Sequence, residues 1–138
     1  MSWLSQYRDR LRTPEQALRL VRSGSRVYVH PGCATPETLV EALAARAPEL
    51  EDVEVTHMLT LGSAAYTRPG LESSFRHNGM FLGANVRAAV AEGRADYIPI
   101  FLSEIEGLFT SGEMPLDTVL LTCSPPDAQG YLSLGVSI

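Results

Sequence analysis

The residues whose types and spacing could support chemistry gather around a short loop of small side chains at 31–34. The loop follows a β-branched and aromatic run at 26–30 and precedes Thr35-Pro36-Glu37, which has the composition of a helix start. In parallel α/β sheets, ligands bind where strands end and helices begin, because loop amides and helix amino termini present unpaired donors there. Gly32 would let a ligand approach the backbone closely. A tight turn that requires small residues is the alternative interpretation.

Cys33 lies at the start of the expected helix and is a candidate nucleophile, because the electropositive end of a helix favours the reactive thiolate. Its partner would have to be His30, His57 or His77. A small buried side chain explains Cys33 equally well. Cys123 lies inside an apolar run and is expected in the core.

The sequence gives less support to a metal site, a nucleotide site or a catalytic carboxylate pair than to the 31–34 loop. No histidine pair has the spacing of a zinc site and no glycine-rich loop matches the nucleotide-binding patterns, so a metal ion and a nucleoside triphosphate are not expected. Glu104 and Glu106 could form a carboxylate pair. The run Ser103-Glu-Ile-Glu106 also matches a capping box, which would use Glu106 to begin a helix.

All eleven basic residues are arginine, whose planar guanidinium group suits carboxylate and phosphate oxygens. Arg68, Arg76 and Arg87 lie in or beside a poorly periodic middle section, where they could hold a carboxylate or a phosphate. Solvation at the surface is the alternative. The net charge of -5 disfavours a nucleic-acid partner, because such binding relies on clustered basic residues.

The chain alternates strand and helix patterns. Strands are expected at 26–30, 53–59, 80–82, 97–102 and 117–123, and helices at 3–11, 13–23, 35–47, 85–93 and 103–112. This order predicts one α/β domain over residues 1–138, with an open, mostly parallel sheet flanked by helices. The apolar run at 117–123 predicts a strand covered on both faces, Pro99 indicates an edge or irregular strand, and 60–78 predicts a long excursion.

The composition bounds the class of protein. A content of 45% hydrophobic and 20% charged residues is typical of a soluble globular domain. Two cysteines are too few for a disulfide framework, residues 1–10 carry no apolar leader, and no stretch is long enough to span a bilayer. We therefore expect a cytoplasmic protein with reduced thiols and no membrane partner.

Six runs form a specific pattern when they are taken together. They are 13–18, 23–28, 32–39, 75–81, 94–102 and 124–135, and the last of them, SPPDAQGYLSLG, is the most distinctive. The pattern resembles the N-terminal domain of the acetyl-CoA hydrolase/transferase family, which includes 4-hydroxybutyrate, butyrate and propionate coenzyme A transferases. The resemblance extends over nearly the whole chain.

The resemblance implies a coenzyme A transferase-like αβα domain that is one half of a two-domain enzyme. The substrates would be an acyl-CoA and a short-chain carboxylate, without a permanently bound cofactor. The family's catalytic glutamate lies further downstream, so no catalytic residue is assigned within 1–138; a C-terminal domain or a partner chain would supply it, and a homo-oligomer is compatible with this. The implied mechanism is ping-pong, through an acyl-glutamyl anhydride and a glutamyl-CoA thioester.

By the same resemblance, three of the runs contain residues that are expected to face the acyl or carboxylate site. They are Gly32, Cys33, Ala34, Thr35 and Pro36, then Arg76 and His77, and finally Ser133 and Gly135. An acyl anhydride survives only where water is excluded and its oxyanion meets preorganised donors, and a small-residue loop at a helix start can provide both.

Three alternatives remain open. An acetyl-CoA hydrolase would use the same chemistry with water as the acceptor. A non-catalytic module would bind acyl-CoA without transfer, and a stand-alone hydrolase would rely on Cys33 or a local histidine. One half of a two-domain enzyme is also expected to expose an apolar face where the other half packs.

Overall fold

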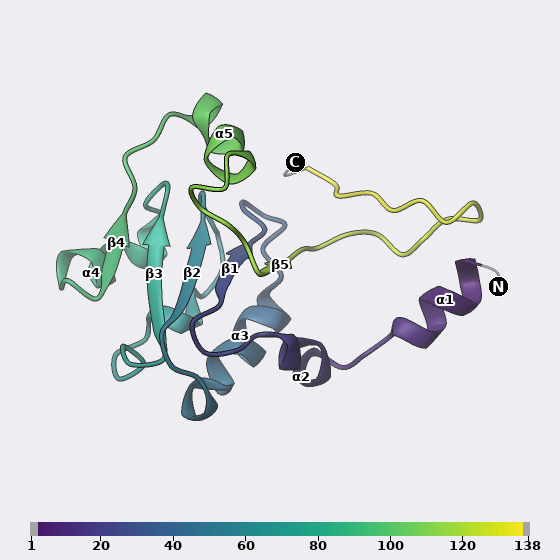
Figure 1. Ribbon diagram of the computed structural model, residues 1–138, viewed down its shortest axis with the longest axis horizontal. Coiled ribbons are helices and arrows are strands. Elements are labelled where there is room, and N and C mark those ends of the chain that lie inside the picture. The colour runs from purple at the N-terminus through teal and green to yellow at the C-terminus, as the bar shows by residue number, and fades with distance from the viewer. Residues whose placement is uncertain (1–2, 137–138) are drawn as a thin grey trace.

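The computed structural model describes residues 3–136 and contains a five-stranded sheet in which all neighbouring strands are parallel (Figure 1). The strands are β1 (Arg26–Val29), β2 (Val53–His57), β3 (Phe75–Gly79), β4 (Ala95–Tyr97) and β5 (Thr118–Leu120). Their order across the sheet is β4-β3-β2-β1-β5. The expected α/β fold with an open parallel sheet is therefore confirmed.

Helices and short 3-10 turns form much of the remaining structure. They are α1 (Trp3–Arg10), α2 (Pro14–Ala17), η1 (Leu18–Leu20), α3 (Glu37–Ala45), η2 (Ala47–Glu49), η3 (Ala65–Thr67), α4 (Ala84–Ala91), η4 (Leu102–Glu104) and α5 (Ile105–Thr110). The start of α2 follows the sequence pattern, because Thr13 Oγ1 accepts from Gln16 N at 3.3 Å and Thr13 N donates to Gln16 Oε1 at 3.1 Å. This capping box, with Pro14 as the first helical residue, confirms the predicted start.

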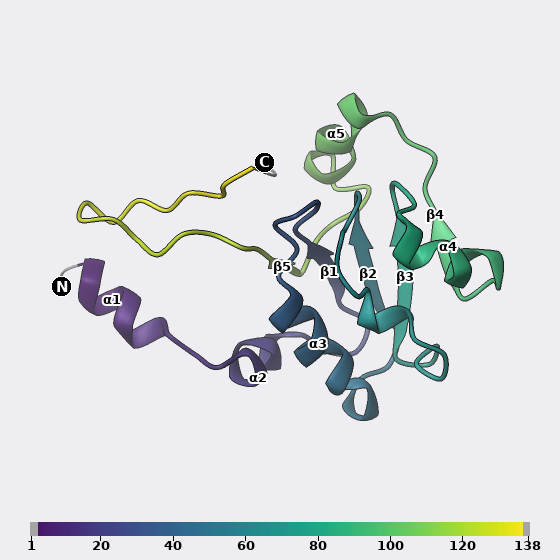
Figure 2. The ribbon, with the colours of Figure 1, turned by 180° about the vertical axis from the view of Figure 1, so that it is seen from behind.

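The hydrophobic core lies against one face of the sheet. Val27, Val29 and Val55 point to this face and are fully buried, and Val40 and Leu43 of α3 belong to the same cluster. Figure 2 shows α2 and α3 next to β1 from behind. Burying a large apolar side chain contributes about 1.5–3 kcal/mol, so the alternation of buried valines decides which face the helices cover.

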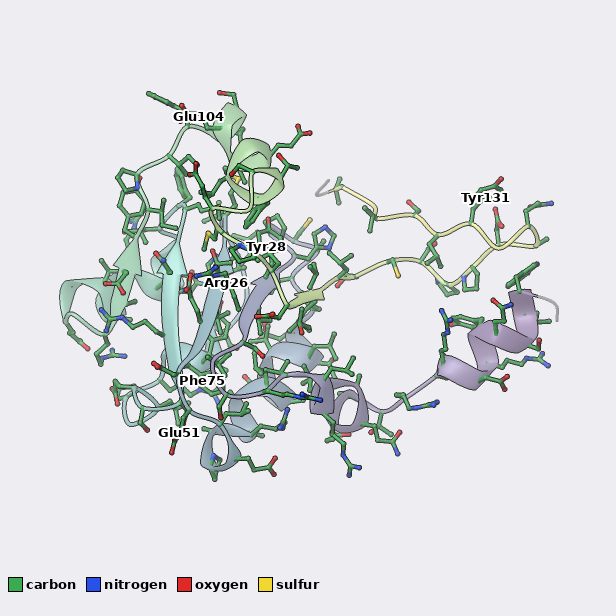
Figure 3. All side chains as sticks on the ribbon, in the orientation of Figure 1. Arg26, Tyr28, Glu51, Phe75, Glu104 and Tyr131 are labelled. Carbon is green, nitrogen blue, oxygen red and sulfur yellow. The ribbon has the colours of Figure 1, made fainter. Side chains whose placement is uncertain are left out.

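The opposite face of the sheet carries paired charges. Arg26 and Glu54 on neighbouring strands lie 2.9 Å apart, and Arg76 and Asp96 lie 2.6 Å apart. Helix α5 approaches this face near β1, where one of its aromatic rings lies edge-on to Tyr28 at 5.6 Å between ring centroids. Figure 3 labels Arg26 and Tyr28 on β1. Cross-strand ion pairs therefore take the place of a second apolar layer on much of this face.

Two of the expected strands at the centre of the sequence were wrong. The strand expected at 80–82 is β3 at 75–79, in which buried Phe75 and His77 alternate with the partly exposed Arg76 and Asn78. The strand was missed in the sequence because its buried positions include a histidine and its other positions are polar, so no apolar run marks it. The run 97–102 is not a buried strand, because β4 ends at Tyr97 and the side chains beyond it are largely exposed.

The expectation for 117–123 was also wrong in part. A strand forms there, but β5 has only three residues and lies at the edge of the sheet. Val119 is 46% exposed and Leu121 is 44% exposed, so residues 3–136 do not cover this run on both faces. Cys123, expected in the core, is exposed. A continuous apolar run does not reveal by itself what covers it.

Two helix starts differ from the expected caps. The N-cap of α4 is Gly83, while Asn85 lies within the helix and turns its side chain toward another loop. Ahead of α5, Phe101 N donates to Glu104 Oε2 at 3.1 Å, so Glu104 takes the role expected of Glu106.

Helix α1 and residues 121–136 together form an arm that projects beyond β5 (Figures 1 and 2). A groove between them is lined by residues of both segments, including Trp3, Tyr7 and Leu132. Gly130 has φ +92°, and a Cβ there would lie only 3.1 Å from the ring of Trp3. Tyr131, labelled at the outer end of the arm in Figure 3, is 75% exposed.

Within residues 3–136, no helix has the length and apolar character that crossing a membrane requires. The longest helix, α3, has nine residues.

Candidate functional site at the carboxyl edge of the sheet

The carboxyl ends of the parallel strands meet at one edge of the sheet, the upper edge in Figure 1. Strands β2, β3 and β4 follow one another on one side of β1, whereas β5 lies on its other side. The chain after β1 leads to β2, whereas the segment after β5 runs away from the sheet on the other side (Figure 1). Ligands in open α/β sheets bind at such a switch point, outside the carboxyl ends of the strands.

A shallow groove of about 440 Å³ lies at this switch point. It is lined by Thr35, Pro36, Glu37, Thr38, Leu39, Leu121, Thr122 and Cys123. One wall is the start of α3 and the other is the segment after β5. Buried His30, directly after β1, holds the second wall to the sheet, because its Nδ1 accepts from Thr122 N at 3.2 Å. A larger groove of about 540 Å³ includes Leu50 and Glu51 beside the amino end of β2, where this rule does not place a ligand.

The turn after β1 leads into one wall of this groove, and Thr35 and Pro36 are the residues of the 32–36 stretch that line it. Gly32 has φ +63°, and its N–H donates to Leu59 O at 2.5 Å, which ties the turn to the loop after β2. Thr35 Oγ1 donates to Gly32 O at 2.8 Å and closes the turn from within. Cys33 is exposed at its tip, whereas Ala34 is buried beneath it. The sequence-predicted residues 32–36 thus form one compact turn ahead of α3.

The loop after β2 is a second part of the edge that the sequence did not reveal. Ser63 N donates to both carboxylate oxygens of Glu37, at 2.9 and 3.2 Å. Asn85 of helix α4 contacts the same loop, because its Nδ2 donates to Thr60 Oγ1 at 3.1 Å and to Gly62 O at 2.9 Å. Contacts between residues more than twenty positions apart leave no periodic signal; Gly62, within the region expected to be an excursion, was the available hint.

A cluster of buried rings lies beneath this edge. His57 and His77 are stacked with 4.3 Å between ring centroids, and Tyr66 lies 6.1 Å from the first and 5.8 Å from the second. Burial lowers the pKa of His57 to about 3 and also lowers the pKa of His77, while burial raises the pKa of Tyr66 well above its usual range. All three rings are therefore neutral near pH 7 and support the loops above them.

Several predicted site residues lie away from the groove. Arg76 is at the amino half of β3, where its guanidinium holds the pKa of Asp96 below its usual range through two hydrogen bonds of 2.6 and 2.7 Å. His77 is 1% exposed, and its Nδ1 lies 2.9 Å from Val55 O. Ser133 and Gly135 are in the arm, where the Ser133 hydroxyl accepts from Gly135 N at 3.2 Å.

The geometry gives little support to thiol or metal chemistry within residues 3–136. Cys33 is exposed, whereas His30, His57 and His77 are at most 3% exposed and make hydrogen bonds with backbone groups. No group of three or more His, Cys, Asp or Glu side chains in this part of the chain is arranged to hold a metal ion.

Comparison with known proteins identifies the relationship. Residues 1–138 match the model of the acetyl-CoA hydrolase/transferase N-terminal domain. The chain belongs to this family. It is 39% identical over 137 residues to the 4-hydroxybutyrate coenzyme A transferase of Clostridium kluyveri, covering 99% of this chain and 32% of that enzyme. The succinyl-CoA:acetate/propanoyl-CoA:succinate CoA transferase of Fasciola hepatica is also 39% identical, over 126 residues, covering 90% of this chain and 26% of that enzyme.

Two solved structures share the fold of this chain. RipA from Yersinia pestis superposes with a TM-score of 0.89 at 31% identity, covering 99% of this chain and 34% of RipA. The 4-hydroxybutyrate CoA-transferase of Porphyromonas gingivalis gives a TM-score of 0.77 at 26% identity, covering 99% of this chain and 30% of that structure. The chain therefore spans about a third of the length of the relatives it matches.

Proposed function

We propose that this chain is the N-terminal part of an acyl-CoA:carboxylate coenzyme A transferase and that its carboxyl sheet edge forms one wall of the acyl site. The observation that carries the proposal is the groove at the switch point, where the compact 32–36 turn meets the segment after β5. The names of the transferases that the chain resembles support the choice of reaction.

The proposed reaction transfers coenzyme A in two half-reactions. A glutamate carboxylate attacks the thioester carbonyl, so that an acyl-glutamyl anhydride forms and coenzyme A leaves as a thiolate. The thiolate then attacks the glutamyl carbonyl of the anhydride, which gives a glutamyl-CoA thioester and releases the first carboxylate. The acceptor carboxylate reverses these steps and leaves as the new acyl-CoA.

The attacking glutamate is proposed to come from outside the 138 residues. Glu37 is the acidic residue that lines the groove, and both of its oxygens are engaged by Ser63 N. Glu104 accepts from Phe101 N at the start of η4. The length of the related enzymes, about three times that of this chain, leaves room for a further domain that carries the nucleophile.

The chain's own contribution would be to shape the site and exclude water. The 32–36 turn is fixed to the loop after β2 and packs on the start of α3, so its amides keep a defined orientation without reorganising during the reaction. The exposed apolar side chains of the arm would pack against the remaining domain and close the site from solvent.

The test is to measure the transfer of coenzyme A from acetyl-CoA to short carboxylates by two proteins. One is the 138-residue chain, and the other is a chimera in which this chain replaces the matching 137-residue region of the Clostridium kluyveri enzyme. We expect the chimera to transfer coenzyme A and the 138-residue chain to be inactive. Transfer or thioester hydrolysis by the isolated chain would contradict an external nucleophile. Acyl-CoA binding without turnover by a folded chimera would contradict the transferase and favour a binding module.

A further inference from the structure

The arginines of this chain fall into two groups. From residue 26 onward, five of the six are ion-paired, namely Arg26, Arg46, Arg68, Arg76 and Arg94. The other five lie between residues 8 and 22, and they are Arg8, Arg10, Arg12, Arg19 and Arg22. All five are exposed, and none of them has an ion-pair partner within residues 3–136. One short segment therefore holds the guanidinium groups that the fold does not neutralise.

Two of these arginines share a groove with an exposed leucine. Arg12 and Arg19 line a groove of about 400 Å³ at the junction of α1 and α2, together with Leu11 and Gln16. Leu11 is 55% exposed, and Leu20, the residue after Arg19, is 77% exposed. We call Leu11, Arg12, Arg19 and Leu20 the arginine surface. Arginine is enriched at protein interfaces, and exposed apolar side chains beside it gain free energy when a partner covers them.

A surface of the opposite charge surrounds α5. Residues 95–138 contain six acidic residues and no basic one. Glu106 and Glu113 are exposed and take part in no ion pair within residues 3–136. Directly ahead of α5, Phe101 and Leu102 are 78% and 71% exposed. These four residues form the acidic surface, which, like the arginine surface, combines exposed apolar side chains with charges of one sign.

The two surfaces lie at different ends of the molecule. Figures 1 and 2 show α5 above the carboxyl edge of the sheet, whereas α2 lies toward the opposite end of the strands. The arginine surface and the acidic surface of one copy are therefore free to face other molecules. Their charges are complementary, and complementary charges orient two proteins and speed their association.

We infer that the arginine surface binds the acidic surface of a second copy of this chain. The exposed leucines and Phe101 supply the apolar area that is buried, and the charges select the orientation. Because each copy carries both surfaces, a two-fold pair makes the contact twice. The inference rests on charge and exposure, and it does not depend on the proposed transfer reaction.

The first test measures self-association of the 138-residue chain by sedimentation equilibrium. The dissociation constant is expected to rise about tenfold between 50 mM and 500 mM salt, because salt screens exposed charges. Arg12→Glu/Arg19→Glu should raise it at least about tenfold at low salt, since acidic groups then face acidic groups. Arg87→Glu, which reverses another exposed arginine without an ion-pair partner in residues 3–136, should leave it unchanged.

A chain that stays monomeric at low salt would overturn the inference. Association of unchanged strength in Arg12→Glu/Arg19→Glu would also overturn it, because a different surface would then make the contact.

A charge swap gives the sharper result. Neither Arg12→Glu/Arg19→Glu nor Glu106→Arg/Glu113→Arg should associate alone, because in each variant the two surfaces carry the same sign of charge. An equimolar mixture should associate within about tenfold of the wild-type chain, because opposite charges face each other again at every contact. Circular dichroism of each variant confirms that it is folded. Folded variants whose mixture stays monomeric would overturn the pairing, whatever the chimera shows about coenzyme A transfer.

Discussion

In the sheet and the helix α3 that packs on it, Val27, Val29 and Leu43 are fully buried, whereas in the arm Tyr131 and Val136 are 75% and 81% exposed. Both regions are rich in apolar residues, so composition does not explain the difference. The sheet buries its side chains against helices of the same chain. In the arm, α1 and residues between 126 and 132 line a shared groove, while Tyr131, Leu132 and Val136 are more than half exposed.

This contrast indicates that the two regions depend on different partners. The sheet and its carboxyl-edge loops contain the buried cluster and the hydrogen bonds that define the groove, so their structure is set within the chain. Exposed large side chains on an extended arm are typical of a surface that another domain covers. The matched relatives, with about three times the length, are consistent with such a domain.

The largest expected effect is the loss of stability after a cavity is made beneath the sheet. Leu43→Ala is expected to lower the free energy of unfolding by about 2–5 kcal/mol, because the removed methyl groups are completely buried. Tyr131→Ala in the arm is expected to change it by less than about 0.5 kcal/mol. Urea unfolding followed by far-ultraviolet circular dichroism gives both values. Equal losses in the free energy of unfolding would contradict the distinction between the two regions.

The next effect is a loss of stability in mild acid that originates in the sheet. The pKa of His57 is about 3 in the folded chain and about 6.5 when unfolded, so the unfolded state binds a proton that the folded state excludes. Stability should be greatest above pH 6.5 and fall as the pH approaches 3. His57 alone accounts for about 2 kcal/mol between pH 7 and pH 5.

Urea unfolding at several pH values measures this loss, and the ring signals of His57 in nuclear magnetic resonance spectra should remain those of the neutral form at pH 5. Titration of His57 near pH 6.5 in the folded chain, or a flat stability profile, would mean that this ring is not buried as described.

The smallest effect is confined to the arm. Gly130→Ala places a side chain at φ +92° and against the ring of Trp3, and is expected to cost about 1–2 kcal/mol locally. Trp3 is the single tryptophan, so its fluorescence reports directly on the contact between α1 and the 126–132 segment. We expect a red shift in this variant with an unchanged unfolding midpoint for the sheet. A lowered midpoint would show that the arm and the sheet unfold as one unit.

The sequence predicted the parts of the molecule that depend on local patterns. The capping box at Thr13, the strand at 26–30 and the small-residue turn before α3 each arise from neighbours within a few positions, and all three are present, the strand ending at Val29. These features were enough to place the groove at the carboxyl edge.

The features that the sequence did not reveal depend on contacts between distant residues. The pairing of Glu37 with Ser63 spans 26 positions, and the role of Asn85 depends on a loop 23 positions away. In β3, the ion pair between Arg76 and Asp96 explains why a polar residue stands in a strand, yet it is visible only once β4 lies alongside. The exposure of Cys123 likewise depends on which elements cover β5.

The central claim is that these residues shape the acyl site but do not carry the nucleophile. The most direct test treats the chimera with acyl-CoA, traps the enzyme-bound thioester with hydroxylamine, and maps the modified peptide by mass spectrometry. We predict a glutamyl hydroxamate outside residues 1–138 and none within them. A hydroxamate on Glu37 or on any other acidic residue of this chain, or an acyl group on Cys33 in a sample that was not treated with hydroxylamine, would contradict the account.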